Sequence, residues 1–160
     1  MRFSRLVAAL LPLSLAACLP TTDPPTVRQE VPIEQTSFAS SLGVDLATST
    51  KTASGMYYRD APLGTGAAAV AVGDSVEVYY KGQLADGSQF DARQTGTPFK
   101  FKVGAGNVIK GWDEGLVGMK VGGTRQLIIP PALGYGASDY GPIPGNSVLV
   151  FSVTLVSDKK

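Results

Sequence analysis

The chain has no histidine, a single cysteine at position 18 and a single tryptophan at position 112. Without histidine, Ser–His and Cys–His nucleophilic pairs and histidine-containing zinc sites are excluded. One cysteine likewise excludes an intrachain disulfide and a cysteine metal cluster. We therefore expect either a simple binding module or chemistry that needs no strong nucleophile.

Charge is nearly balanced, and no strongly basic segment is present. The 14 basic and 13 acidic residues give a net charge of +1 at pH 7, and no basic block or stripe stands out. Nucleic acid is therefore not an expected partner. The length of 160 residues suffices for one compact domain with an extension.

Residues 1–17 combine two arginines with a mainly apolar stretch, which is typical of a signal peptide that is later removed. The stretch is shorter than the ~20 residues that a membrane-spanning helix needs. Residues 15–18 (Leu-Ala-Ala-Cys) match the bacterial lipoprotein box, so we expect lipidation of Cys18 and anchoring to a membrane. An ordinary secretory leader is the alternative. Leu19 after the cysteine favours the periplasmic side of the outer membrane within the cell envelope.

Residues 18–54 contain clustered prolines followed by many serines and threonines. This composition predicts a flexible tether between the lipidated cysteine and a folded domain. Phe38, Leu42 and Leu46 are spaced four apart and would form one helical stripe, although Gly43 and the polar residues disfavour a stable helix. Packing of this segment on the domain therefore remains an alternative.

Residues 55–160 show the pattern of a small domain built from strands and turns. Apolar and polar residues alternate over 76–81 and 99–103, Leu127 and Ile129 form a third set on one face, and a last strand over 147–156 has Leu149, Phe151, Val153 and Leu155 on one face, so four strands are predicted. Eighteen of the 19 glycines fall in 55–145, as tight turns require, and Asp86-Gly87 is a turn signal between strands.

A helical period appears only around the tryptophan, where Ile109, Trp112 and Leu116 fall on one face. Together with the alternating strands, this predicts an α+β fold in which one curled antiparallel sheet wraps over one short α-helix. A large aromatic on a short helix that follows a glycine-rich loop can floor a shallow pocket, or it can simply fill the core.

Short motifs follow one another in a fixed order along this domain. They are Tyr80-Lys81-Gly82, the segment 86–91, Pro98 to Phe101, Val108 to Leu116, Tyr135-Gly136-Ala137, Ile143-Pro144 and the segment 148–151. In this order and spacing, the set resembles the FKBP family of peptidyl-prolyl isomerases from about residue 55 to residue 156. The resemblance implies prolyl isomerase activity on unfolded or partly folded Pro-containing polypeptides, no cofactor, and binding of macrolides such as tacrolimus or rapamycin.

Prolyl isomerisation suits this inventory of residues. Rotation about an X–Pro bond breaks amide resonance and takes tens to hundreds of seconds unaided. A catalyst has to remove the planar amide from water and bind the twisted form more tightly than either planar form. An aromatic pocket with a few hydrogen bonds can do so without a nucleophile or a metal.

The resemblance also assigns roles to individual residues. Catalytic roles fall on Trp112 as the floor under the proline ring, on the Ile109 N–H and the Tyr135 hydroxyl as donors to substrate carbonyls, and on Asp91 as a polar partner at the pocket edge. The residues expected to bind substrate are Tyr80, Phe90, Phe99, Val108, Tyr140, Ile143 and Phe151.

Some of these assignments have support in the strand pattern itself. Tyr80, Phe99 and Phe151 fall on the inner faces of their expected strands, whereas Phe101 is expected in the core in any case. Asp91 directly follows Phe90, so the strand has to end or bulge there if Asp91 faces the pocket.

The chain departs from the family at three points. Asn107 stands where the family often has a carboxylate. The segments 91–98 and 138–142 are each about one residue short, so Arg93 receives no role.

Two other functions fit the same residues. One is a non-catalytic, membrane-anchored chaperone or binding module that holds Pro-containing segments. The other is a structural envelope lipoprotein in which the aromatic residues are only core. The complete set of pocket residues favours an isomerase that acts on proteins folding outside the cytoplasm.

Overall fold

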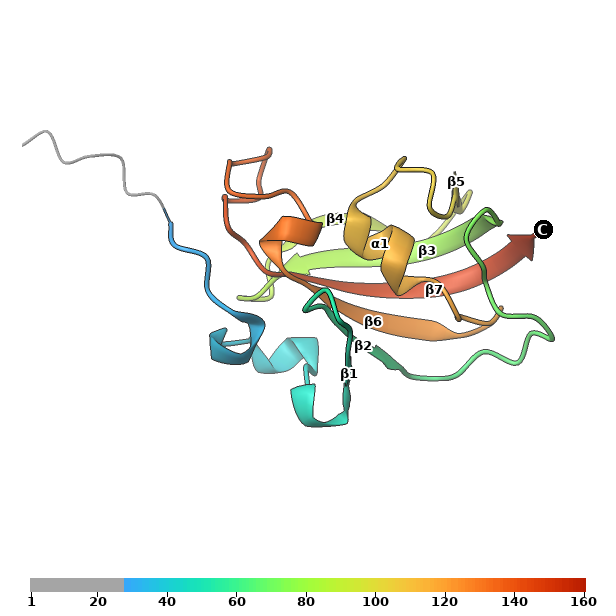
Figure 1. The fold of residues 1–160 in the computed structure, drawn as a ribbon, viewed down its shortest axis with the longest axis horizontal. Helices are drawn as coiled ribbons and strands as arrows, with labels where there is room; N and C mark the ends of the chain where they lie inside the picture. Colours follow the sequence, from blue (N-terminus) through green and yellow to red (C-terminus); the bar gives the residue numbers. More distant parts are fainter. Residues whose placement is uncertain (1–27) are drawn as a thin grey trace, which may run out of the picture.

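The computed structural model describes residues 28–160, so the expected signal peptide and Cys18 lie outside the described residues. In the described part, seven strands form one antiparallel sheet in the order β1-β2-β6-β7-β3-β4, and β5 pairs with β3 (Figure 1). The strands are β1 (Thr50–Lys51), β2 (Tyr57–Asp60), β3 (Ser75–Leu84), β4 (Gln89–Arg93), β5 (Phe99–Lys102), β6 (Thr124–Ile129) and β7 (Leu149–Lys159). The helices are α1 (Lys110–Gly115) and four short 3-10 helices, η1 (Ile33–Gln35), η2 (Ser40–Leu42), η3 (Leu46–Thr48) and η4 (Pro131–Leu133).

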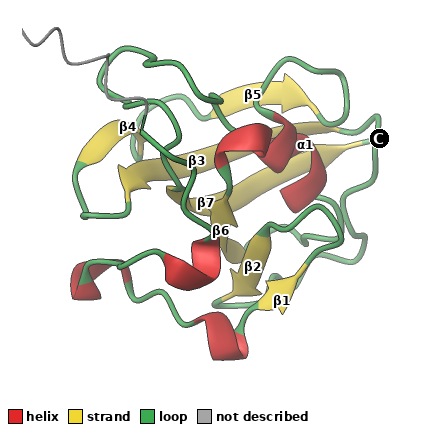
Figure 2. Ribbon diagram, turned by 60° about the vertical axis from the view of Figure 1, so that its left-hand side comes forward, coloured by secondary structure: helices red, strands yellow, loops and turns green. Residues whose placement is uncertain are grey.

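The curled antiparallel sheet with one short helix confirms the predicted fold class (Figure 2). Strand β3 pairs with β7 on one side, and with β5 and then β4 on the other side. The predicted alternation is visible along it, because Val76 and Val78 are fully buried while their neighbours are partly exposed. No helix within residues 28–160 is both long enough and apolar enough to span a bilayer.

Helix α1 lies against one face of the sheet and begins after Ile109, which has an extended backbone (φ −61°, ψ 148°). Two glycines on its sheet side explain how closely it approaches. A Cβ atom at Gly111 would lie 2.6 Å from Cγ2 of Ile129, and one at Gly115 would lie 2.7 Å from Cδ2 of Leu127. Larger residues at these positions would push the helix away from β6.

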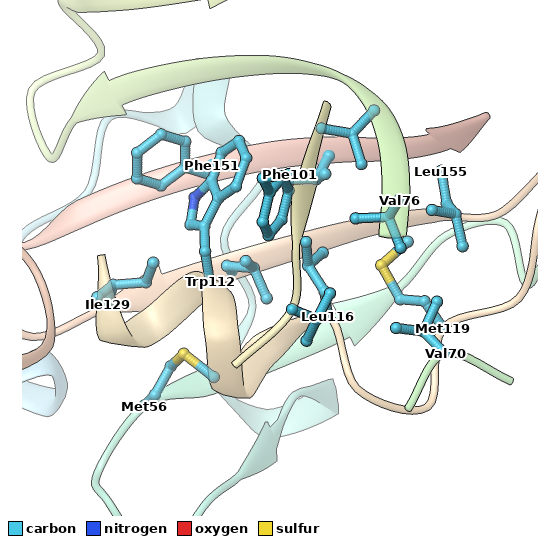
Figure 3. Close-up of a cluster of buried hydrophobic side chains, with 14 of the residues drawn as sticks. Met56, Val70, Val76, Phe101, Trp112, Leu116, Met119, Ile129, Phe151 and Leu155 are labelled. Atoms are coloured by element: carbon cyan, nitrogen blue, oxygen red, sulfur yellow. The ribbon is translucent and has the colours of Figure 1, made fainter. Parts of the chain in front are cut away.

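The main core lies between α1 and this face of the sheet, and Figure 3 shows part of it. Trp112 and Leu116 project from the helix into the core and are 4% and 0% exposed. The sheet contributes alternate residues of its strands, including Leu149, Phe151 and Val153 of β7. The face that the sequence predicted for Ile109, Trp112 and Leu116 is therefore the core-facing side of the helix.

Residues 33–48, which we call the N-terminal strap, pack on part of the opposite face of the sheet, over β2, β6 and the start of β7 (Figure 1). Ile33 and Leu42 are buried in a second apolar cluster. The other members of this cluster are Tyr57, Ile128, Val148 and Val150, with Phe38, Ala39, Val44 and Leu46 packed against it.

The predicted tether over 18–54 is therefore corrected for its described part, because the folded unit begins near residue 33 rather than at residue 55. The predicted helical stripe is also corrected. Its three residues all pack on the sheet, but they do so from irregular chain and separate 3-10 helices rather than from one α-helix. Burial of the apolar residues outweighs the polar composition around them.

Candidate functional site

An open cavity of about 180 Å³ lies above Trp112, between the N-terminal end of α1 and the inner face of the sheet. Its lining residues are Tyr80, Asp91, Phe99, Asn107, Val108, Ile109, Trp112, Tyr135 and Phe151. Eight of these nine are residues that the sequence assigned to the site. The ninth residue, Asn107, was noted in the sequence only because the FKBP family often has a carboxylate at this position.

Trp112 forms the floor, and neighbouring rings meet it edge to face. Its ring centroid lies 5.0 Å from that of Tyr80 and 5.3 Å from that of Phe151, and both interplanar angles are 83°. Such contacts are each worth about 0.5–1.5 kcal/mol beyond area burial. They hold the indole in place as the aromatic floor of the cavity.

A β-bulge places Asp91 at the cavity edge, as the sequence required. Asp91 pairs with Gly82 and Gln89 pairs with Gln83, which leaves Phe90 as the extra residue on β4. Gly82 is essential to this arrangement, since a Cβ atom there would lie 2.7 Å from the Phe151 ring and 2.8 Å from the Phe90 ring.

Tyr80 holds the Asp91 carboxylate. Its hydroxyl donates a hydrogen bond to Oδ2 of Asp91 at 2.6 Å. Burial, followed by this hydrogen bond, raises the pKa of Tyr80 to about 12. Tyr80 therefore remains a neutral donor at physiological pH, and it orients a carboxylate at the edge of a largely aromatic cavity.

Tyr135 lines the cavity from the loop after η4. Its ring stacks on that of Tyr140, with a centroid distance of 4.5 Å and an interplanar angle of 13°. Burial raises the pKa of Tyr135, so its hydroxyl keeps its proton at neutral pH. Within residues 28–160 this hydroxyl makes no hydrogen bond, which leaves it free to donate to a ligand.

The second free donor is the backbone N–H of Ile109, which has no hydrogen-bond partner in the described chain. Asp113 fixes the glycine loop that leads to it. The carboxylate accepts hydrogen bonds from the N–H of Gly104 at 2.8 Å and from that of Gly106 at 3.0 Å. Both glycines have a positive φ, at 77° and 71°, which other residues rarely adopt.

Three residues that the sequence assigned to substrate binding do not line the cavity. Phe90 packs edge to face on Phe151 with a centroid distance of 5.4 Å, and Ile143 is buried in the core at 4% exposure. Tyr140 is 61% exposed and covers the outer side of Tyr135. These side chains support the wall from behind. Strand alternation and motif order could not distinguish lining residues from supporting ones.

The arrangement can hold a small apolar ring against the indole and donate hydrogen bonds to carbonyl groups on either side of it. In the part of the chain that the structure describes, no group of three or more Cys, Asp or Glu side chains could hold a metal ion. The geometry is that of a binding pocket for a ring flanked by carbonyls.

Comparison with known proteins identifies the family to which the chain belongs. Residues 66–156 match the family of FKBP-type peptidyl-prolyl cis-trans isomerases, and the chain belongs to this family. It is 60% identical over 86 residues to FK506-binding protein 2 of Emericella nidulans, which is 52% of this chain and 64% of that protein. It is 47% identical over 135 residues to FK506-binding protein 4 of Aspergillus oryzae, which is 84% of this chain and 27% of that protein.

Two solved bacterial structures share the fold. FkpA from Escherichia coli has a TM-score of 0.64 and 42% identity, over 70% of this chain and 52% of that chain. A peptidyl-prolyl cis-trans isomerase from Pseudomonas syringae pv. tomato has a TM-score of 0.63 and 32% identity, over 71% of this chain and 82% of that chain. The chain spans less than two thirds of the length of the two curated relatives.

Proposed function

We propose that this protein is a peptidyl-prolyl cis-trans isomerase that acts on Pro-containing segments of unfolded or partly folded polypeptides. The observation that carries the proposal is a cavity floored by Trp112 and lined also by Ile109 and Tyr135, whose N–H and hydroxyl donors have no partner within residues 28–160. A proline ring fits an apolar floor, and the carbonyls beside it fit the two donors.

The proposed catalysis rests on desolvation and shape. The aromatic walls take the X–Pro amide out of water, which favours the twisted form because that form has lost amide resonance and is the less polar one. Donors that meet the substrate carbonyls best in the twisted geometry lower the barrier, since only interactions stronger in the transition state accelerate the step. Asp91, held by Tyr80, completes the polar edge.

A protease-coupled assay on a short X–Pro peptide tests this function. The protein used is residues 18–160 with Cys18→Ser, which retains the strap. We expect isomerisation above the uncatalysed rate, and lower kcat/KM for Tyr135→Phe. Peptide binding without isomerisation in the folded protein would instead favour a holding chaperone.

The same pocket is proposed to bind macrolides such as tacrolimus or rapamycin, as the names of the FK506-binding relatives suggest for those proteins. Asn107 removes a charge at the rim relative to the carboxylate often found there, so we expect weaker binding than a carboxylate would give. Titration monitored by Trp112 fluorescence measures it. A folded protein that neither binds nor is inhibited at high micromolar ligand would contradict the pocket assignment.

We also propose that the protein is anchored in the cell envelope through lipidated Cys18, with the outer membrane as the favoured site. The support is the Leu-Ala-Ala-Cys box at 15–18 in a chain whose apolar leader is too short to span a membrane. Cys18→Ala should release the protein from membranes without unfolding the domain. Fractionation together with the mass of the product separates loss of the anchor from retention of an uncleaved leader.

A further inference from the structure

The N-terminal strap contacts the hairpin that carries Asp91. The backbone N–H of Ala39 donates a hydrogen bond to the carbonyl of Ala85 in the β3–β4 turn, at 2.8 Å. The next residues of the turn also lie against the strap, because a Cβ atom at Gly87 would be 3.3 Å from Cβ of Ala39 and 3.2 Å from Oγ of Ser41.

The turn is internally well bonded, so it transmits its position to β4. The N–H of Leu84 donates to the carbonyl of Ser88 at 2.8 Å, and that of Gly87 donates to the carbonyl of Leu84 at 3.0 Å. Oδ1 of Asp86 accepts from the N–H of Ser88 at 2.8 Å. A shift of the turn therefore moves the start of β4 with it.

Strand β4 depends on this support. It is an edge strand of five residues that pairs only with β3, and its ladder is interrupted by the bulge at Phe90. Asp91 follows the turn by three residues and is exposed, and its side chain is held by the hydroxyl of Tyr80. The turn and Asp91 are therefore separated only by the short, bulged start of β4.

Leu42 and Gly43 of the strap are hydrogen-bonded to strands β6 and β2. The carbonyl of Leu42 accepts a hydrogen bond from Nε2 of Gln126 in β6 at 2.7 Å, and that of Gly43 accepts one from Nη2 of Arg59 in β2 at 2.8 Å. The side chain of Leu42 itself is buried against the sheet. The strap therefore joins two strands of the sheet to the tip of the β3–β4 hairpin.

We propose that the N-terminal strap is a positioning element of the active site, which holds the β3–β4 turn and through it Asp91. The strap precedes residue 66, where the match to the family model begins. The inference rests on the proposed isomerase function. A strap that only covers apolar surface would stabilise the fold without acting through Asp91.

Ala39→Pro tests the contact, because it removes the donor to Ala85 while φ at this position, −59°, already suits proline. Ser40→Pro is the matched control. Ser40 is exposed, is the first residue of η2 and has an N–H without a hydrogen-bond partner, and Ala39 before it is extended. We expect kcat/KM to fall about two- to tenfold for Ala39→Pro and to stay unchanged for Ser40→Pro.

A double-mutant cycle with Asp91→Ala separates positioning from general destabilisation. If the strap acts through Asp91, Ala39→Pro has no further effect on kcat/KM in the Asp91→Ala protein. The inference would be overturned if Ala39→Pro lowered kcat/KM equally in both backgrounds. It would also be overturned if the wild-type protein were active and Ala39→Pro alone did not lower its kcat/KM. An inactive wild-type protein would instead refute the proposed function itself.

A second variant covers the case in which Ala39→Pro does not fold. Leu42→Ala loosens the strap at its anchored part, while the residues of the turn and the Ala39 donor stay the same. It should lower kcat/KM in the wild-type background and not in the Asp91→Ala background, at a temperature where thermal unfolding shows both proteins to be folded. The same loss in both backgrounds would again contradict positioning through Asp91.

Discussion

Arg125 and Asp60 face each other across β6 and β2 in a two-pronged ion pair. Nε of Arg125 donates to Oδ1 of Asp60 at 2.7 Å, and Nη2 donates to Oδ2 at 2.8 Å. The remaining nitrogen, Nη1, donates to the carbonyls of Gly115 at 2.8 Å and Val117 at 2.9 Å, at the C-terminal end of α1. Because α1 carries Trp112, this pair holds the floor of the cavity from the side away from the substrate.

Asp60→Asn should lower the stability of the fold and loosen this end of the helix. The arginine is only 5% exposed, so it would lose its counter-charge while remaining buried. Hydrogen bonds to charged groups are worth about 1.5–3 kcal/mol, which corresponds to a fall in Tm of several degrees for a chain of this size. Thermal unfolding followed by Trp112 fluorescence measures the change, and Glu30→Gln at an exposed position serves as the control. An unchanged Tm would show that the pair contributes little.

Tyr135→Phe should reduce kcat/KM while the fold stays intact, because it removes one donor and keeps the ring. The loss of one hydrogen bond predicts a change of a few-fold to about tenfold. Tyr79→Phe is the matched control, since the Tyr79 hydroxyl donates to the carbonyl of Gly96 outside the cavity lining. Equal effects of the two substitutions would argue against a donor role for Tyr135.

Asp91→Ala should also lower kcat/KM only partially. No residue does covalent or acid–base work in this mechanism, so the loss should lie between about tenfold and about a hundredfold, as expected for a charge-assisted hydrogen bond. The peptide assay with purified, folded variant measures it. Complete loss of activity would point to a chemical role that the mechanism does not include.

Activity should be nearly constant between pH 6 and pH 8. The chain has no histidine, and the pKa values of Tyr80 and Tyr135 are raised above their ordinary value, Tyr80 to about 12. Both hydroxyls therefore keep their protons across this range, and loss of the Tyr135 donor is expected only above pH 10. A steep bell-shaped profile of kcat/KM between pH 6 and pH 8 would require a titrating catalytic group.

The strap should loosen in acid because of Glu34. Its Oε1 accepts hydrogen bonds from Nζ of Lys51 at 2.5 Å and from the hydroxyl of Tyr57 at 2.6 Å, and these bonds lower the pKa of Glu34 to about 2. A lowered folded-state pKa gives stability that is complete above the ordinary value of 4.5 and is lost as pH falls toward 2. Denaturation at pH 7 and pH 3 should show a smaller difference for Glu34→Gln than for the wild type. An identical difference would assign the acid sensitivity to other groups.

Much of the fold follows from local patterns in the sequence. Alternation in β3, β5 and β7 and the helical period around Trp112 each reflect burial of one face, so a single segment suffices to predict them. The bulge at Phe90 was also foreseeable, because adjacent residues in a regular strand face opposite sides and the site needed Asp91 at its edge.

The strap was harder to predict because its packing depends on a distant partner. The signal lay in β7, where Val150 stands on the face opposite Leu149 and Phe151, and it is 3% exposed beneath the strap. The difference between lining and supporting residues in the site had no local signal either. It depends on how the loop after η4 folds back and stacks Tyr140 on the outer side of Tyr135.

One of the two free donors in the cavity belongs to the peptide backbone of Ile109, and this restricts how the protein can escape an inhibitor. Every substitution at position 109 except proline keeps that N–H group, because only proline lacks it. A substitution of Ile109 by any residue other than proline can therefore weaken inhibitor binding only by changing the side chain that lines the cavity, and not by removing this hydrogen-bond donor. An inhibitor that relies on the backbone donor and makes little use of the Ile109 side chain would leave this position few routes to resistance.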